Sequence, residues 1–390
     1  MVENKDKKVL NVPNLRFPEF EGEWEKCKLG DITQNFTRRN KEKIQYPMFS
    51  VTNERGFVPQ SEQFEGRDMV GDDIKAYKII QSQEFAYNPA RINVGSIAMY
   101  SGKAPCMISS LYVCFKTTQK VDDEWLMQLL KTAKLNYCYN VNGEGGVRVY
   151  LFYPNFARIR VSLPSLTEQK KIACFLNLLD ERISTQNKII EDLKKLKCAI
   201  IEKLYSEIQG KEYLYGQLFE VVNKRNKQME YSNILSASQE KGMVNRDDLN
   251  LDIQFERSNI NTYKIVRAGD YVIHLRSFQG GFAFSDKLGV CSPAYTILRP
   301  NCLLEYGYLS YYFTSHRFIK SLIIVTYGIR DGRSINIEEW LNMKVIIPSK
   351  EYQLHTLKIL RSIEGKIENE ETYTICLSNQ KQYLLNQMFI

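Results

Sequence analysis

The chain has 390 residues, of which 44% are hydrophobic and 25% charged, and its formal net charge is +8. This composition is ordinary for folded proteins and excludes a disordered tail, and the length predicts two or three domains. The sequence has no run of about 18 apolar residues, which excludes a membrane-spanning helix. The charged first residues are not followed by an apolar signal core. We therefore expect a cytoplasmic protein whose basic charge is compatible with nucleic acid.

Scattered cysteines and histidines argue against a metal or catalytic site. The nine cysteines form no C-x-x-C pair, and only three histidines are present, so we expect reduced core thiols and no metal site. The phosphate-binding loop, HExxH and G-x-S-x-G motifs are absent. Residues 88–91 read NPAR and fall short of the tetrad of adenine methyltransferases, which indicates a turn. We expect a chain that is not an enzyme and holds no cofactor.

The first half of the chain begins with an aromatic-rich region that carries basic clusters. We expect short strands at 95–100 and 111–115 and a short helix at 124–133. Arginine, lysine and asparagine side chains contact phosphates or base edges in protein–DNA complexes. The candidate DNA contacts of this half are Arg38, Arg39, Lys41, Arg91, Asn93 and Arg148. Ordinary solvated or tight turns are the alternative for each cluster.

A long helix is expected after Pro164. Ser165 and Glu168 have the spacing of a capping box, and neither proline nor glycine interrupts the sequence before Gly210. Apolar residues then recur with a 3.5-residue period, which is typical of a coiled-coil seam. The expected seam residues are Ile172, Leu176, Leu179, Ile183, Ile190, Leu193, Ile200 and Leu204. About 40 helical residues would form a rod of about 60 Å, which is longer than one domain of this size.

The second half repeats the first at a nearly constant shift. The triplet Arg-Asn-Lys at 39–41 recurs at 225–227, YKII at 77–80 recurs as YKIV at 263–266, and Pro164 recurs as Pro348. An ordered series of such matches indicates internal duplication. Strands are expected at 271–275 and 295–298, and a helix at 308–319. The matching candidate DNA contacts are Lys224, Arg225, Lys227, Arg276, Gln279, Arg330 and Arg333.

A second long helix ends the chain and repeats the seam. Its expected seam residues are Leu360, Ile363, Ile367, Leu377, Leu384 and Met388. The polar interruptions Gln186 and Lys197 of the first seam recur in register as Glu370 and Lys381. Because polar seam residues specify register, this recurrence favours two helices that pair with each other. The alternative is two amphipathic helices, each lying on its own globular domain.

Net charge is concentrated outside the long helices. Residues 166–208 contain eight basic and seven acidic side chains, and residues 350–390 contain five of each. The excess positive charge therefore lies mainly in the two globular repeats. We expect the helices to act as a spacer and the repeats to meet a polyanion.

The order globular repeat, long helix, globular repeat, long helix resembles the specificity subunits of type I restriction–modification systems. The strongest local similarity is at 159–173, which read IRVSLPSLTEQKKIA, followed by 179–183 and 193–197. Residues 18–24 resemble the opening of the family. The second helix start keeps Pro348 and Gln353 but has Tyr352 where the first has Glu168. The similarity extends over essentially the whole chain.

The resemblance implies an α+β protein built from two mixed target-recognition domains and two long helices paired as an antiparallel coiled coil, with a pseudo-two-fold from the duplication. The first domain would span 1–164, the first helix 165–210, the second domain 211–348 and the second helix 349–390. Each domain would read one half of a split target on double-stranded DNA. The subunit would bind two methyltransferase subunits and, beyond them, restriction–translocation subunits. S-adenosylmethionine, ATP and magnesium would then belong to those partners.

A second hypothesis remains open at this point. The chain could be a non-enzymatic coiled-coil scaffold whose repeats bind protein or RNA. Salt-dependent binding to duplex DNA would separate the two hypotheses.

Overall fold

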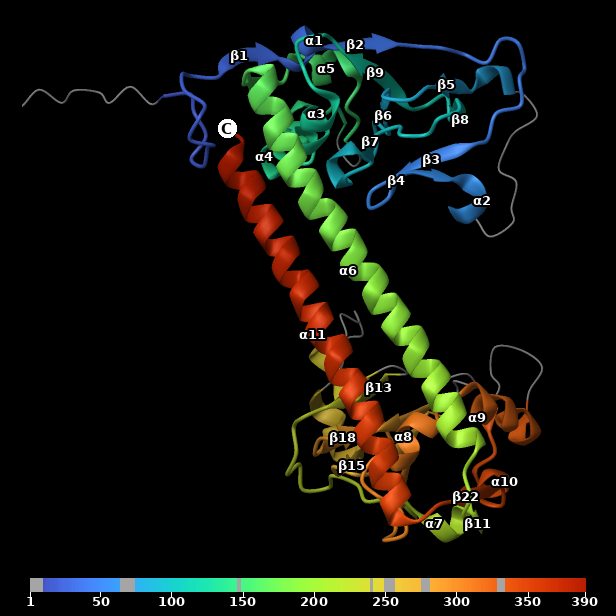
Figure 1. Ribbon diagram of the computed structural model, residues 1–390. Coiled ribbons are helices and arrows are strands. Elements are labelled where there is room, and N and C mark those ends of the chain that lie inside the picture. Colours follow the sequence, from blue (N-terminus) through green and yellow to red (C-terminus); the bar gives the residue numbers. More distant parts are fainter. Residues whose placement is uncertain are drawn as a thin grey trace, which may run out of the picture. The chain divides into compact units, whose positions relative to one another are not determined.

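The computed structural model describes residues 10–63, 74–145, 149–238, 241–248, 257–274, 281–327 and 334–390, and Figure 1 labels many of its elements. The chain folds into two compact units. Unit 1 comprises Met1–Gln186 and Tyr373–Ile390, and unit 2 comprises Asn187–Thr372. Each unit mixes short antiparallel strands with helices, which confirms the predicted α+β class.

Unit 1 is organised around a four-stranded antiparallel sheet in the order β2-β9-β6-β7. Three further pairs, β1-β10, β3-β4 and β5-β8, surround this sheet. The strands are β1 (Glu25–Lys28), β2 (Thr33–Phe36), β3 (Phe49–Thr52), β4 (Gly56–Pro59), β5 (Lys78–Ile80), β6 (Phe85–Tyr87), β7 (Ile97–Met99), β8 (Cys106–Ile108), β9 (Val113–Thr117) and β10 (Arg160–Leu163). The helices are α1 (Leu29–Ile32), α2 (Gln60–Gln63), η1 (Ile74–Ala76), η2 (Ile92–Val94), α3 (Asp123–Leu130), α4 (Ala133–Asn142), α5 (Tyr153–Arg158) and the first part of α6 (Leu166–Ser206).

Unit 2 repeats this arrangement with the sheet order β12-β19-β16-β17 and the pairs β11-β22, β13-β14 and β15-β18. A further pair, β20-β21, has its counterpart in unit 1 as an isolated bridge. The strands are β11 (Lys211–Leu214), β12 (Phe219–Val222), β13 (Leu235–Ser238), β14 (Gly242–Asn245), β15 (Lys264–Val266), β16 (Tyr271–Ile273), β17 (Phe282–Phe284), β18 (Gly289–Cys291), β19 (Thr296–Pro300), β20 (Thr326–Tyr327), β21 (Ser334–Ile335) and β22 (Lys344–Ile347). The helices are the second part of α6, α7 (Tyr215–Leu218), η3 (Arg246–Asp248), η4 (Arg257–Thr262), α8 (Tyr308–Tyr312), α9 (His316–Ser321), η5 (Leu322–Val325), α10 (Ile337–Leu341) and the first part of α11 (Lys350–Met388), whose last part belongs to unit 1. The predicted duplication is therefore confirmed in three dimensions.

The central sheet of each unit separates two hydrophobic cores. In β6, Phe85 and Tyr87 join the core formed with the helices, whereas Ala86 joins the core under the strand pairs β3-β4 and β5-β8. In β16, Tyr271 joins the core formed with the helices of unit 2, and Val272 joins the core on the opposite face of the sheet. Successive side chains of a strand point to opposite faces, so both faces of this sheet are covered.

The glycines that recur between the repeats close equivalent hairpins. Gly56, the first residue of β4, has φ +65°, and Gly242, the first residue of β14, has φ +69°. Left-handed backbone at these positions is readily adopted by glycine and strained for other residues. The repeated glycine in the sequence is thus explained by turn geometry.

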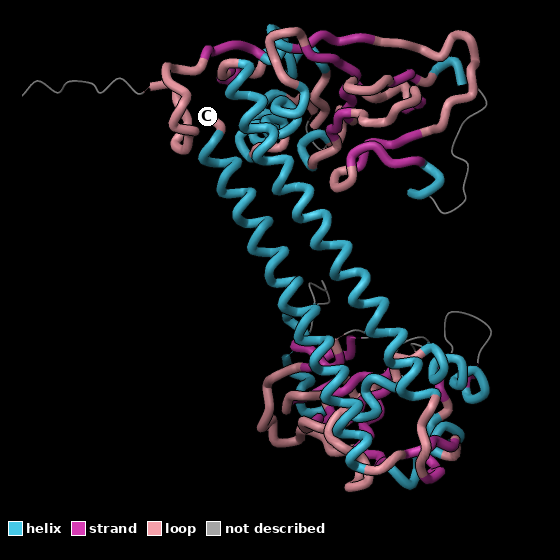
Figure 2. The backbone as a smooth tube through the Cα atoms, in the orientation of Figure 1, coloured by secondary structure: helices cyan, strands magenta, loops and turns pink. Residues whose placement is uncertain are grey.

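The two long helices lie side by side within each unit (Figure 2), and they run in opposite directions. In unit 1, the Lys381 Nζ atom lies 2.5 and 2.7 Å from the two carboxylate oxygens of Asp180. In unit 2, the Lys197 Nζ atom lies 2.6 Å from a carboxylate oxygen of Glu364. Because Lys197 and Asp180 recur 184 positions later as Lys381 and Glu364, the same contact is made twice with the roles of α6 and α11 exchanged.

The expected seam positions are shielded from solvent on both helices, whereas most positions between them are exposed. Eight of them are buried and six are half-buried. The buried ones are Ile172, Leu176, Ile190, Leu360, Ile367, Leu377, Leu384 and Met388, and the half-buried ones are Leu179, Ile183, Leu193, Ile200, Leu204 and Ile363.

The helix ends also enter the domain cores, which a strict heptad does not anticipate. Ile201 and Leu385, one residue away from the seam, are buried in the cores of units 2 and 1. Each of these ends lies in the core of the other repeat and not of the repeat that its helix follows, so they do not support the hypothesis of helices lying on their own domains.

A buried glutamine anchors the start of each long helix. The Gln169 amide donates to the carbonyls of Pro164 (2.9 Å) and Lys120 (3.2 Å) and accepts from the backbone N–H of Asp122 (2.8 Å). Gln353 makes the equivalent three bonds, to Pro348, Leu303 and Glu305, at 3.1, 3.0 and 2.8 Å. Both glutamines are fully buried. The shared Pro-to-Gln spacing therefore reflects one structural joint between helix and domain.

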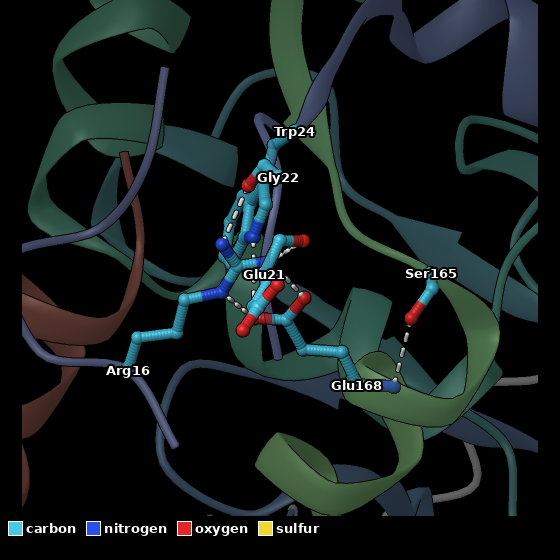
Figure 3. Close-up of polar contacts among 6 residues, drawn as sticks. All are labelled: Arg16, Glu21, Gly22, Trp24, Ser165 and Glu168. Atoms are coloured by element: carbon cyan, nitrogen blue, oxygen red, sulfur yellow. Dashed lines mark hydrogen bonds and ion pairs between the residues drawn. The ribbon is translucent and has the colours of Figure 1, made fainter. Parts of the chain in front are cut away.

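The predicted capping box at Ser165 is only half formed, as Figure 3 shows. The Ser165 hydroxyl accepts from the Glu168 N–H at 3.3 Å. The Glu168 carboxylate instead receives two 2.8 Å bonds from Arg16 and a 3.2 Å bond from the Trp24 indole. In unit 2, the residue at this place is Tyr352, whose hydroxyl donates to the carbonyl of Leu204 in α6. The sequence difference follows because Arg16 and Trp24 of the N-terminal segment contact this position in unit 1, whereas the end of α6 contacts it in unit 2.

Two other sequence expectations need correction. The helix expected at 308–319 is divided into α8 and α9, because the Ser315 hydroxyl accepts from the Phe318 N–H and starts a new helix. All nine cysteines are free thiols, but four of them are exposed rather than in the core. Three of these four lie on outward faces of α6 and α11, where the helix pairing leaves them in solvent.

Candidate nucleic-acid interface

The repeated Arg-Asn-Lys triplet forms the same turn in both units. The Asn40 side chain donates to the Ile44 carbonyl at 2.7 Å and accepts from the Ile44 N–H at 3.0 Å. Asn226 bonds to Tyr231 in the same way, at 2.7 and 3.3 Å. Both asparagines are 1% exposed. The asparagine therefore has a structural role, and it holds the flanking basic residues on the outside of the turn.

The basic residues beside these asparagines are exposed in both units. They are Arg39 and Lys41 in unit 1 and Lys224, Arg225 and Lys227 in unit 2. An exposed cation on a fixed turn can contact a phosphate without distinguishing bases. Their contact with DNA stays a prediction.

Arg38 differs from its neighbours because it is paired within the fold. Its guanidinium donates two 2.8 Å bonds to Glu84, whose side chain is 10% exposed, and this pair raises the pKa of Arg38. In unit 2, the carboxylate equivalent to Glu84 is Asp270, and it receives two 2.9 Å bonds from Arg299. The arginine that pairs with this carboxylate therefore differs between the units: it is Arg38 in unit 1 and Arg299 in unit 2. Lys224, which matches Arg38 in the repeat, is exposed. The fold accounts for Arg38, and a DNA contact by this residue stays a prediction.

A second candidate group surrounds η2. Arg91 is exposed and precedes η2, and Gly95 ends η2 with φ +99°. The Asn93 amide donates to the Asn140 side chain of α4 at 3.0 Å. This bond places Asn93 and α4 on one surface, and the sequence offered no sign of the connection. The unit 2 candidates Arg276 and Gln279 lie outside the described residues.

The third candidate group is the glycine- and arginine-containing segment of each repeat. Arg148, Arg330 and Arg333 lie outside the described residues, but the residues that flank them pair in an antiparallel manner. Glu144 and Tyr150 exchange two 2.8 Å backbone hydrogen bonds in unit 1. In unit 2, β20 and β21 pair through Tyr327 and Ser334. Equivalent ladders therefore bracket the two segments.

Neither a metal site nor a membrane helix emerges from the described part of the chain. Within it, no three or more His, Cys, Asp or Glu side chains are grouped so that they could hold a metal ion. No helix there is both long and apolar enough to cross a membrane.

The fold and the candidate site thus consist of a duplicated α+β unit with exposed basic turns and a pair of antiparallel helices. Comparisons with known proteins show which families share these features. Residues 21–195 match the family of type I restriction modification DNA specificity domains.

Curated relatives match over almost the full length. The type I restriction enzyme MjaVIII specificity subunit of Methanocaldococcus jannaschii is 25% identical over 428 residues, covering 98% of this chain and 95% of the relative. A relative assigned to the MjaX system of the same organism is 22% identical over 409 residues, covering 97% and 96%.

Solved structures share the fold. The S subunit of a type I restriction–modification system from M. genitalium has a TM-score of 0.54 at 12% identity, covering 97% of this chain and 99% of that chain. A chain from a study of complex assembly and conformational transition in a type I system has a TM-score of 0.59 at 14% identity, covering 94% and 97%. Residues 21–195 therefore carry the sequence pattern of a type I restriction modification DNA specificity domain, and the whole chain is similar to type I specificity subunits in sequence and in fold.

Proposed function

We propose that this chain is the specificity subunit of a type I restriction–modification system and that it reads a bipartite target on double-stranded DNA, with one domain for each half-site. In this proposal the recognition domains span 1–164 and 211–348, and the helices at 165–210 and 349–390 separate them. Two methyltransferase subunits and restriction–translocation subunits bind the chain in the cytoplasm. Those partners hold the S-adenosylmethionine, ATP and magnesium of the reactions.

One observation carries the proposal: the two units share a scaffold, and their exposed side chains are alike at some matched places and different at others. Arg39 and Arg225 are alike and exposed, which suits contact with the phosphate backbone that every sequence presents. Arg38 and Lys224 occupy matched places but differ in exposure and pairing. Two similar supports with different exposed groups suit two different half-sites.

We assign the DNA contacts to the exposed basic turns, to Arg91 and Asn93 beside η2, and to the candidate residues that lie outside the described part of the chain. In unit 1 these are Arg39, Lys41, Arg91, Asn93 and Arg148, and in unit 2 they are Lys224, Arg225, Lys227, Arg276, Gln279, Arg330 and Arg333.

Binding experiments test the proposal against the alternative scaffold that binds protein or RNA. The chain is assembled with its methyltransferase partner, and affinity for duplex DNA is measured across a range of salt concentrations. Several phosphate contacts should make log K fall steeply and linearly with log salt concentration, by close to one unit per contact. Equal affinity for RNA of the same sequence, or no binding to DNA, would reject the proposal.

We also propose that the paired helices set the gap between the half-sites. Seven residues inserted after Gln186 and seven after Thr372 would lengthen both helices by one heptad and keep the seam in phase. The number of unspecified base pairs in the methylated target should then change. An unchanged gap would reject this role of the helices.

A further inference from the structure

Helix α4 of unit 1 is held to the domain by one face. The Thr132 hydroxyl accepts from the Leu135 N–H at 3.3 Å and begins the helix. Leu135 and Tyr139 are buried, and the Tyr139 hydroxyl donates to the Leu130 carbonyl at 2.9 Å. These contacts orient the helix and leave its opposite face in solvent.

The exposed face of α4 is rich in groups that can bind base edges. Lys134, Asn136, Tyr137, Asn140 and Val141 are all exposed, and Tyr137 is 70% exposed. The helix contains no aspartate or glutamate. Asparagine and tyrosine are poorer helix formers than alanine or leucine, so helix stability does not explain their presence on this face.

Unit 2 keeps the support of this helix and changes its exposed face. The Ser315 hydroxyl begins α9 as Thr132 begins α4, and Phe318 and Leu322 are buried at the places of Leu135 and Tyr139, 183 positions earlier. The exposed residues Arg317, Lys320, Ile323 and Ile324 replace Lys134, Tyr137, Asn140 and Val141. Residues 316–325 also lack acidic side chains.

Two of the proposed DNA contacts, Arg91 and Asn93, lie next to this face. The Asn93–Asn140 bond at 3.0 Å connects α4 to η2 and to the exposed Arg91 that precedes η2. Beyond the end of α4, Glu144 pairs with Tyr150 through two backbone hydrogen bonds. The Glu144 carboxylate accepts from the Asn155 amide at 2.7 Å, so this acidic group is engaged within the fold. A surface with basic and amide groups and without acidic residues on its helix complements DNA.

We propose that the exposed face of α4 reads bases of the first half-site, and that the equivalent face of α9 and η5 reads bases of the second. The major groove of DNA admits an α-helix. Asparagine pairs with adenine through two hydrogen bonds, and arginine or lysine pairs with guanine. Asn136, Tyr137 and Asn140 therefore determine specificity in unit 1, as Arg317 and Lys320 do in unit 2. This inference rests on the proposed bipartite recognition.

The test uses the complex of the full chain with its methyltransferase and the bipartite duplex found by mapping methylated adenines. Each base pair of the duplex is changed in turn, and affinities are compared for the wild type and for the variant Asn136→Ala/Tyr137→Ala. Both side chains are exposed, so the variant should unfold at the wild-type temperature. Asn140 is kept because it also bonds to Asn93.

The variant should lose about 5- to 150-fold discrimination at one or two positions of one half-site, and the other half-site should be read as before. Arg317→Ala/Lys320→Ala should have the reciprocal effect. Asn379→Ala, which removes an exposed asparagine from α11, is the control and should leave discrimination at both half-sites unchanged. If Asn136→Ala/Tyr137→Ala kept full discrimination at both half-sites, or lost it equally at both, the inference would be overturned. A wild-type complex that methylates no bipartite target would instead overturn the proposed function.

Discussion

At the scale of single residues, two adjacent arginines have different roles. Arg38 is bound to a buried carboxylate, whereas Arg39 is exposed on the same turn. In unit 2, Arg299 replaces Arg38 as the partner of the matched carboxylate, Asp270. The duplicated domains have therefore kept the buried ion pair and moved the arginine that completes it.

Arg38→Ala and Arg39→Ala should separate folding from DNA binding. Removing Arg38 leaves the Glu84 carboxylate buried without its cation, and we expect a loss of about 1–3 kcal/mol in the free energy of unfolding. Removing Arg39 should leave that free energy unchanged and reduce the salt slope of DNA binding by about 1. Urea titrations and salt-dependent binding measure both effects. The reverse pattern would contradict the assignment.

The buried glutamines make a second residue-scale prediction. Gln169→Ala leaves two backbone carbonyls and one backbone N–H without their partner at the start of α6. We expect about 2–3 kcal/mol of destabilisation, since unsatisfied buried polar groups are costly. Gln353→Ala should have a similar effect in unit 2. Gln380→Ala, at an exposed site on α11, is the control and should stay within about 0.5 kcal/mol of the wild type in urea titrations. Equal effects at 169 and 380 would show that the buried amide is unimportant.

At the scale of elements, the long helices are joined to the domains by polar groups from three elements. In unit 1, the Asp180 carboxylate binds Lys381 of α11 and also accepts from the Gln128 amide of α3 at 2.9 Å. In unit 2, the Glu364 carboxylate binds Lys197 of α6 and accepts from the Tyr311 hydroxyl of α8. Each domain is thereby fixed to its helix pair at a matched place.

A double-mutant cycle measures this coupling. Asp180→Asn, Lys381→Met and the double variant should give a coupling energy of about 1 kcal/mol, because the lysine is largely shielded and the groups are in direct contact. The fully exposed pair Glu191–Lys195 on α6 is the matched control, and its coupling should be too small to measure. A coupling for Asp180–Lys381 no larger than this control would contradict a role in joining the helices.

The elements differ in how much their sequence reveals. The long helices were predictable because one short period repeats over many turns and recurs 184 residues later. Helix α4 was missed because its asparagines and tyrosines give little helical signal. The Arg16–Glu168 pair joins residues 152 positions apart, and no local pattern indicates such a contact. The reading face on α4 was invisible for the same reason: it depends on which side of a weakly patterned helix is anchored.

At the scale of the whole molecule, unit 1 is built from both ends of the chain. Leu384, Leu385, Met388 and Phe389 belong to its hydrophobic core, and the Phe389 ring lies 5.8 Å from that of Trp125. Unit 2 has the equivalent contact between Tyr205 and Tyr308, at 5.4 Å, from one continuous segment. Unit 1 therefore cannot complete its core until the last residues of the chain are present.

Phe389→Ala should therefore destabilise unit 1, most of which lies far from residue 389 in the sequence. Loss of this buried ring should cost unit 1 about 3 kcal/mol, so amide protons of α3 should exchange faster while those of α8 are unchanged. Tyr383→Ala, which removes a 61% exposed ring from the last turns of α11, is the control. Equal acceleration in both units, or none in α3, would contradict this dependence.

Mapping methylated adenines in cells that express this chain with its methyltransferase partner tests the central claim most directly. Two units with one scaffold and different exposed side chains should yield two different specified half-sites separated by unspecified base pairs, and the methylation should disappear without the chain. A single continuous motif, or methylation that does not depend on the chain, would contradict the assignment of one unit to each half-site.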